Sequence, residues 1–147
     1  PGMQLIDPIA GLIFTGILDK HPKLKIVMAE AGIAWVSSMI QSLDNYYVRL
    51  AEGRVQAGSG VTKADLPKKI PYEYFPELIW ITFQDDAAGI QMLGLLDENK
   101  VMWASDYHHP ASTWPESQQV IEAQMKGVSA ATRQKILFDN ARDLYGL

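Results

Sequence analysis

Cysteine is absent from the 147 residues of the chain, which excludes disulfide bonds and thiolate metal ligands. Long hydrophobic runs are missing as well, because no apolar stretch approaches the roughly 20 residues that a membrane-spanning helix needs. The first residues, PGMQLIDPIAGLIF, lack the basic start that is typical of a signal peptide. We therefore expect no membrane contact, and the cytoplasm is the default location.

Positive charge is also scarce. The chain has 13 Lys and Arg residues against 17 Asp and Glu residues, and its formal net charge is −4 at pH 7. A broad nucleic-acid-binding surface is therefore not expected. No glycine-rich phosphate loop or dinucleotide fingerprint occurs either. Because 48% of the residues are hydrophobic and the length suits one domain, we expect a single globular domain over residues 1–147.

Three short apolar runs are the main signal for the fold. They are rich in β-branched and aromatic residues and cover Leu24–Ala29, Leu78–Phe83 and Val101–Ser105. Stretches with helical periodicity separate them, and this alternation is typical of a parallel sheet with right-handed crossovers. The sequence therefore predicts an α/β fold with three parallel strands that are neighbours in chain order.

The segments between the strands predict several helices. One begins at Asp7 and continues through Leu18, and a long amphipathic helix covers Ile33–Leu50. The Gly- and Pro-rich stretch Ala51–Pro76 predicts a long loop with a short helix near Ala64–Leu66. Three later helices are expected from the residues that cap their first turns. Either Asp85 or Asp86 caps a helix over Ala87–Leu96. Ser117 caps a helix that continues to Met125, and Ser129 caps the last helix.

Carboxylates follow all three predicted strands. Glu30 comes after the first strand, Asp85 after the second and Asp106 after the third. The carboxyl ends of parallel strands meet at one edge of the sheet, and α/β folds place their chemistry there. Asp106 can bind a metal or accept a proton. The alternative is that Asp106 caps a turn, that Glu30 pairs with a basic group or caps a helix, and that the histidines after Asp106 are solvated.

The segment SDYHHPASTWP at residues 105–115 resembles the SDYPHxxxTWP segment of the amidohydrolase-related family. This group contains aminocarboxymuconate semialdehyde decarboxylase and resorcylate-type decarboxylases. Further matching segments occur in the same order along the chain: LIFTGILDKHPKLKIVMAEAGIAWV, YFPELIWITFQDDAAG and KILFDNARDLYGL. The resemblance implies a TIM (β/α)8 barrel, which needs roughly 250 residues. The chain is therefore expected to be its C-terminal part, about three strand–helix units.

The resemblance also implies an activity and residue roles. It implies a metal-dependent hydrolase or decarboxylase of a small carbonyl or carboxylate substrate. Asp106 matches the family Asp that binds or adjoins the metal, and Glu30 stands where many members carry a metal-binding histidine. His109 aligns with the histidine of the family's Pro-His pair, and His108 replaces the proline. The predicted sets are Asp106, His109 and Glu30 as catalytic residues, Asp106 and Glu30 as metal ligands, and His108, Trp114 and Asp85 as substrate contacts.

The implied cofactor is a divalent metal ion, with zinc first and manganese or magnesium as alternatives. The family's other metal ligands lie on a first and a middle strand that this chain does not contain, so the chain alone is expected to bind metal weakly or not at all. Two other interpretations stay open. One is a catalytically inactive α/β fragment that self-associates or binds a partner, and the other is an unrelated α/β binding domain.

Open sheet edges predict association with a second copy or with the missing half of the barrel. We also expect the inward-facing side chains of Val27, Ile79 and Met102 to lack barrel partners and to form an exposed apolar patch.

Overall fold

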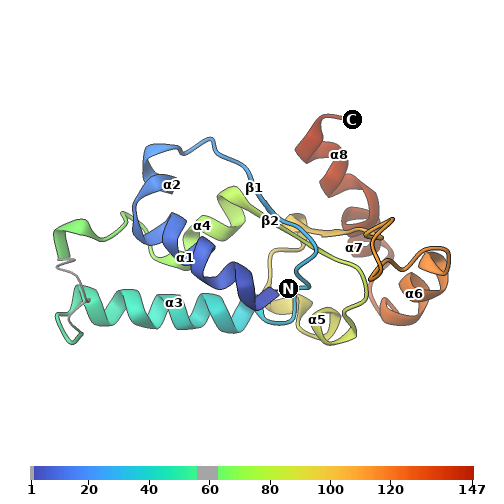
Figure 1. The fold of residues 1–147 in the computed structure, drawn as a ribbon, viewed down its shortest axis with the longest axis horizontal. Helices are drawn as coiled ribbons and strands as arrows, with labels where there is room; N and C mark the ends of the chain where they lie inside the picture. The colour runs from blue at the N-terminus through green and yellow to red at the C-terminus, as the bar shows by residue number, and fades with distance from the viewer. Residues whose placement is uncertain (1, 56–62) are drawn as a thin grey trace.

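The computed structural model describes residues 2–55 and 63–147 and contains a three-stranded parallel sheet with helices packed around it (Figure 1). The strands are β1 (Ile26–Met28), β2 (Ile79–Phe83) and β3 (Val101–Trp103). They lie in the order β1-β2-β3, and both neighbouring pairs are parallel. The prediction of three parallel strands in chain order is therefore confirmed, although each strand is shorter than its apolar run.

The helices before β2 differ from the expected pattern in two places. The first predicted helix is divided by Gly16, whose φ of 70° lies in the left-handed region that favours glycine. The stretch Ala51–Pro76, which was predicted to be a loop with one short helix, also contains the start of a helix at Pro71. Residues 56–62 of this stretch lie outside the described part of the chain. The observed elements are η1 (Gly2–Leu5), α1 (Ile6–Phe14), α2 (Ile17–Lys20), α3 (Val36–Ala51), η3 (Lys63–Asp65) and α4 (Pro71–Leu78).

Helix α4 was missed because its two prolines resemble those of a loop. Pro71 stands in the first helical turn, where its missing N–H leaves no hydrogen bond unmade. The carboxylate of Glu73 accepts a hydrogen bond from the backbone N–H of Ile70 and so helps to begin the helix. Since α4 leads directly into β2, it lies at the amino end of the strands, opposite the end that carries Asp106.

After β2 the chain forms short helices. Asp86 caps α5 by accepting a hydrogen bond from the N–H of Gly89 at 2.8 Å, and Ser129 caps α7 in the same way. Ser117 does not cap its helix: it is the first helical residue, and its hydroxyl pairs with Thr113. The elements are α5 (Ala87–Gln91), η4 (Leu93–Leu95), η5 (Glu98–Lys100), α6 (Ser117–Gln124), α7 (Ala130–Gln134), the π-helical η6 (Lys135–Asp139) and α8 (Asn140–Tyr145).

The two faces of the sheet pack against different helices. Ile79, Ile81 and Phe83 belong to the main core with residues of α1, α3 and α4. Because side chains alternate along a strand, Trp80 and Met102 lie on the other face, where they pack with Leu144 of α8. Lys100 covers Trp80 as well, with its Nζ 3.6 Å from the centre of the indole ring.

The expected exposed patch on the inward side is therefore wrong. Ile79 lies on the helix-covered face and is 1% exposed, and Met102 is 3% exposed because α8 covers it. Val27 is half-buried beside the same cluster. Because α8 packs against this face of the sheet, the apolar side chains that were predicted to be exposed there are covered.

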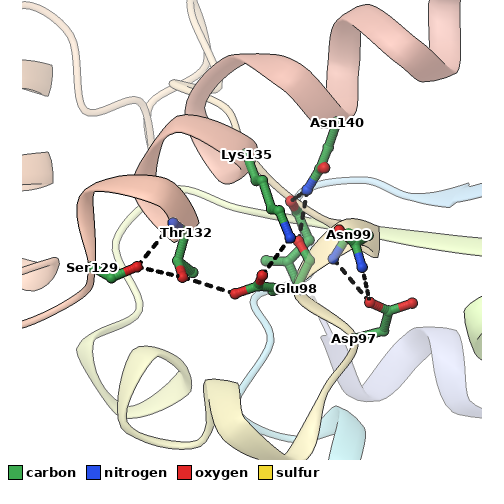
Figure 2. A network of polar contacts seen from close by, with 8 residues as sticks. Asp97, Glu98, Asn99, Ser129, Thr132, Lys135 and Asn140 are labelled. Carbon is green, nitrogen blue, oxygen red and sulfur yellow. Dashed lines mark hydrogen bonds and ion pairs between the residues drawn. The ribbon is translucent and has the colours of Figure 1, made fainter.

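Polar contacts hold the C-terminal helices at the amino end of β3 (Figure 2). The side-chain amide of the buried Asn140 donates to the carbonyls of Glu98 and Val101, at 2.7 Å each. Lys135 and Thr132 both contact the Glu98 carboxylate, at 2.5 and 2.8 Å. These contacts place the start of α8 at the amino end of β3, whereas Asp106 follows the carboxyl end of the same strand.

We expect the chain to self-associate in solution. Among the described residues, β1 and β3 each pair with a strand on one side only, and unpaired edges present N–H and C=O groups to other chains. With the inward face covered, the strand edges alone support this expectation. Sedimentation at micromolar concentration tests it, and a clean monomer of 16.4 kDa would contradict it. No helix among residues 2–55 and 63–147 is long and apolar enough to cross a membrane.

Candidate active site at the carboxyl ends of the strands

Glu30 and Asp106 stand in two turns that follow β1 and β3. Both residues have a φ of 57°, in the left-handed region that costs a residue other than glycine about 1–2 kcal/mol. The backbone N–H of Glu30 donates to the hydroxyl of Thr82 on β2, at 2.9 Å. Backbone conformations of this kind persist where the surroundings impose them, and they concentrate at functional sites.

The two turns bring Glu30, Asp106 and His109 together. His109 Nδ1 lies 2.8 Å from Asp106 Oδ1 and 3.7 Å from Glu30 Oε2. One possible metal-ligating atom from each residue lies within 4.8 Å of the others. The Asp106 side chain is 6% exposed, whereas those of Glu30 and His109 are 51% and 58% exposed. The cluster therefore has a buried carboxylate at its base and opens toward solvent.

The charges of the cluster are coupled. Burial works to raise the pKa of Asp106, but the hydrogen bond with His109, together with contributions from Gln84 and Glu30, outweighs it and holds that pKa below its usual value. The hydrogen bond with Asp106 raises the pKa of His109, and the negative charges of Asp106 and Glu30 add to this effect. Both shifts therefore favour the charged form of the group, the imidazolium of His109 and the carboxylate of Asp106.

The predicted substrate contacts lie around the cluster in different ways. The ring of His108 stacks on His109, with ring centres 6.1 Å apart. Tyr107 contacts both His108 and Trp114, so a row of rings extends from His109 to the exposed Trp114. Asp85 is exposed and does not belong to the cluster of metal-ligating groups found among the described residues.

Two supporting residues of the site, Thr82 and Gln124, were not predicted from the sequence. Thr82 holds the backbone of Glu30. The carbonyl of Gln84 accepts hydrogen bonds from Trp103 Nε1 and Gln124 Nε2, at 2.9 and 2.7 Å. One feature of the sequence could have indicated Thr82, because it is the single residue with a hydroxyl group in the apolar run LIWITF.

The donor set fits a divalent metal ion. Carboxylate oxygens and imidazole nitrogens are ligands for Zn²⁺, and carboxylates also suit Mn²⁺ and Mg²⁺. Two carboxylates and one imidazole offer three protein ligands, which is the number that catalytic zinc sites commonly have. Asp106, Glu30 and His109 are the described residues that could hold such an ion.

Solved structures resemble nearly the whole chain. A 5-carboxyvanillate decarboxylase from Sphingomonas paucimobilis matches 99% of this chain and 41% of its own, with a TM-score of 0.76 and 22% identity. A dihydroxybenzoic acid decarboxylase from Polaromonas sp. JS666, solved with manganese and the inhibitor 2-nitroresorcinol, matches 99% and 41%, with a TM-score of 0.72 and 19% identity. An amidohydrolase from Mycobacterium avium subsp. paratuberculosis K-10 matches 95% and 33%, with a TM-score of 0.73 and 27% identity.

The chain thus spans 33% to 41% of the length of these proteins. Among curated proteins, no sequence relative was found. A family model described as Amidohydrolase matches residues 4–147, which excludes the alternative of an unrelated α/β binding domain. The four segments that resembled the family in the sequence all lie within or overlap this match. The chain belongs to the amidohydrolase family.

Proposed function

We propose that the chain is part of a metal-dependent hydrolase or decarboxylase that acts on a small carbonyl or carboxylate substrate. The observation that carries this proposal is the convergence of Glu30, Asp106 and His109 at the carboxyl end of the strands. Structural neighbours that decarboxylate dihydroxybenzoate or carboxyvanillate support the choice of substrate class. The remaining strands of a (β/α)8 barrel would supply the other metal ligands and enclose the substrate.

Asp106 and Glu30 would hold the metal, with His109 as the third group. Manganese bound in a neighbour of the same fold supports a divalent ion, and zinc stays the prediction from the sequence. A bound divalent ion polarises a carbonyl and lowers the pKa of bound water to about 7. Because Asp106 is buried beside His109 and stays ionised, its carboxylate is suited to accept a proton in hydrolysis or to orient a substrate in decarboxylation.

The aromatic row provides the substrate-facing surface in this proposal. His108 and Trp114 are exposed and belong to the row of rings that begins at His109, so both can contact a planar substrate whose carboxylate faces the metal ligands. Asp85 is exposed after β2 and lies at the same end of the sheet. Its predicted role as a substrate contact is kept as part of the proposal.

Metal binding by the 147-residue chain tests this proposal. We expect weak binding, because two of the three ligands are more than half exposed and the other family ligands are not in this chain. Mn²⁺ titration followed by electron paramagnetic resonance should show an occupancy that Glu30→Gln and Asp106→Asn both lower. Binding that both variants leave unchanged would contradict these ligands. Stoichiometric metal retained through dialysis against a chelator would mean that the three residues form a complete site.

A catalytically inactive fragment that self-associates is the second candidate. The exposure of Glu30 and His109 favours it, because a catalytic site normally excludes water more completely than this cluster does. In that case the chain forms oligomers, the oligomers carry no divalent metal, and no longer form of the protein turns over a substrate. Metal analysis of the oligomers separates the two candidates.

A further inference from the structure

Asp86 joins two connections of the sheet through three backbone hydrogen bonds. Its Oδ1 accepts from the N–H of Gly89 and so caps α5. Its Oδ2 accepts from the N–H groups of Ile33 and Ala34, at 2.6 and 3.0 Å, in the connection between β1 and α3. One carboxylate thus serves as a helix cap and as a bridge to a turn that lies 53 residues earlier in the chain.

The bridged turn is the one that carries Glu30. Glu30 is held at its own N–H by Thr82, and the turn is held three and four residues later by Asp86. Between these points lies Gly32, with a φ of 68°, where an added Cβ would stand 3.0 Å from Asp86 Oδ2. The turn is therefore held at both ends, by Thr82 of β2 at Glu30 and by Asp86, which follows β2, at Ile33 and Ala34.

Asp86 is itself fixed from α6. Its N–H donates to Gln124 Oε1 at 2.9 Å, and Gln124 Nε2 donates to the carbonyl of Gln84 at 2.7 Å. Gln124 is buried, so both ends of its amide are used inside the protein. A continuous set of hydrogen bonds therefore runs from α6 through Asp86 to the turn of Glu30, and Asp86 does not belong to the metal-ligating cluster.

We propose that Asp86 is a positioning residue, which keeps Glu30 in its left-handed conformation and directed toward Asp106 and His109. The physical reason is that a non-glycine residue at this φ returns to a more favourable conformation unless its surroundings prevent it. Loss of the bridge leaves two N–H groups of the turn without partners and frees the turn to rearrange. The role of Glu30 as a metal ligand rests on the proposed function, whereas the positioning of the turn does not.

The test is Asp86→Ser. Serine is a good helix cap, so it keeps the contact with Gly89, but it is too short to reach Ile33 and Ala34. Amide hydrogen exchange measured by NMR should become at least about tenfold faster at Glu30, Ile33 and Ala34 than in the native chain. The Mn²⁺ concentration that half-broadens the Asp106 amide signal should rise about 10- to 100-fold, the usual effect of removing a residue that orients a metal ligand.

Asn140→Ala is the matched control, because Asn140 is also buried and also joins distant backbone groups, but at the opposite end of the sheet. It should lower global stability without selectively exposing the Glu30 amide and without changing the Mn²⁺ response. Should Asp86→Ser fail to fold, Asp86→Asn keeps the shape of the side chain but has one acceptor oxygen for two sets of N–H donors, and the same two readouts apply.

Two results would overturn the inference. One is an unchanged Glu30 amide in a folded Asp86 variant, and the other is an equal change in Asn140→Ala. If instead the native chain shows no Mn²⁺ broadening near Asp106, the proposed metal site fails while the exchange data still judge the positioning of Glu30. The two failures are therefore distinguishable.

Discussion

Replacing Asp106 by asparagine should lower turnover by about 10²- to 10⁴-fold, the usual contribution of a positioned acid or base, in any form of the protein that has catalytic activity. Asp106 is the buried carboxylate at the base of the cluster, and His109 bonds directly to it. Asparagine keeps the shape of the side chain but removes the charge that binds a cation or accepts a proton. Steady-state kinetics with excess metal would measure this loss.

The fold should survive this substitution. Asparagine adopts the left-handed region more readily than most residues, so the φ of 57° at this position is tolerated. The bond from the His109 N–H to the backbone carbonyl of residue 106 does not involve the side chain. Urea unfolding should therefore change little. Asp143→Asn, on the exposed side of α8, is the matched control for losing one negative charge, and activity of Asp106→Asn within a few-fold of native would refute its catalytic role.

Gly89→Ala should lower the free energy of unfolding by about 3 kcal/mol, which is the largest of the predicted changes in stability. A Cβ at this position would stand 2.3 Å from Ile33 Cγ1 and 2.5 Å from Asp86 Oδ2. Neither neighbour can move freely, because Ile33 is fully buried and Asp86 is held by its three N–H partners. The clash therefore disturbs the cap of α5 and the turn of Glu30 together. Urea unfolding at equilibrium would measure the change in the free energy of unfolding.

Gly11→Ala is the control for this prediction. Gly11 lies within α1, and no atom lies within 4 Å of where its Cβ would stand. Alanine at an unobstructed helical position commonly stabilises a protein by about 0.4–1 kcal/mol, so this variant should be slightly more stable than the native chain. If Gly89→Ala were as stable as Gly11→Ala, the residues around Ile33 would have to rearrange to accommodate the added methyl group, which would contradict the prediction.

The amino-acid sequence by itself determined the order and parallel direction of the strands. The apolar runs and helical periods that predict these elements are local patterns, so they can be recognised without knowledge of the packing. The placement of Glu30 and Asp106 after strands then predicted their convergence, which follows from parallel topology. The family also followed from the sequence, because the SDYHHPASTWP segment and three others occur in a specific order.

Only the tertiary structure decided which face of the sheet each strand residue covers. Alternation along a strand shows which residues share a face, but not which of the two faces packs against which helices. The sequence therefore did not reveal that Ile79 faces α1, α3 and α4, whereas Trp80 faces α8. Helix α4 was not recognised for a different reason. Pro71 is tolerated because it stands in the first turn, but Pro76 stands inside the helix, where proline is normally disfavoured.

The roles of the adjacent Asp85 and Asp86 could also not be separated from the sequence. A helix cap requires one carboxylate near the start of α5, and both residues meet that condition. Asp86 takes the role because its second oxygen meets the N–H groups of Ile33 and Ala34, which lie far away in the chain. Local preferences act between residues a few positions apart, whereas a hydrogen bond between two connections exists only after the strands have paired and brought those connections together.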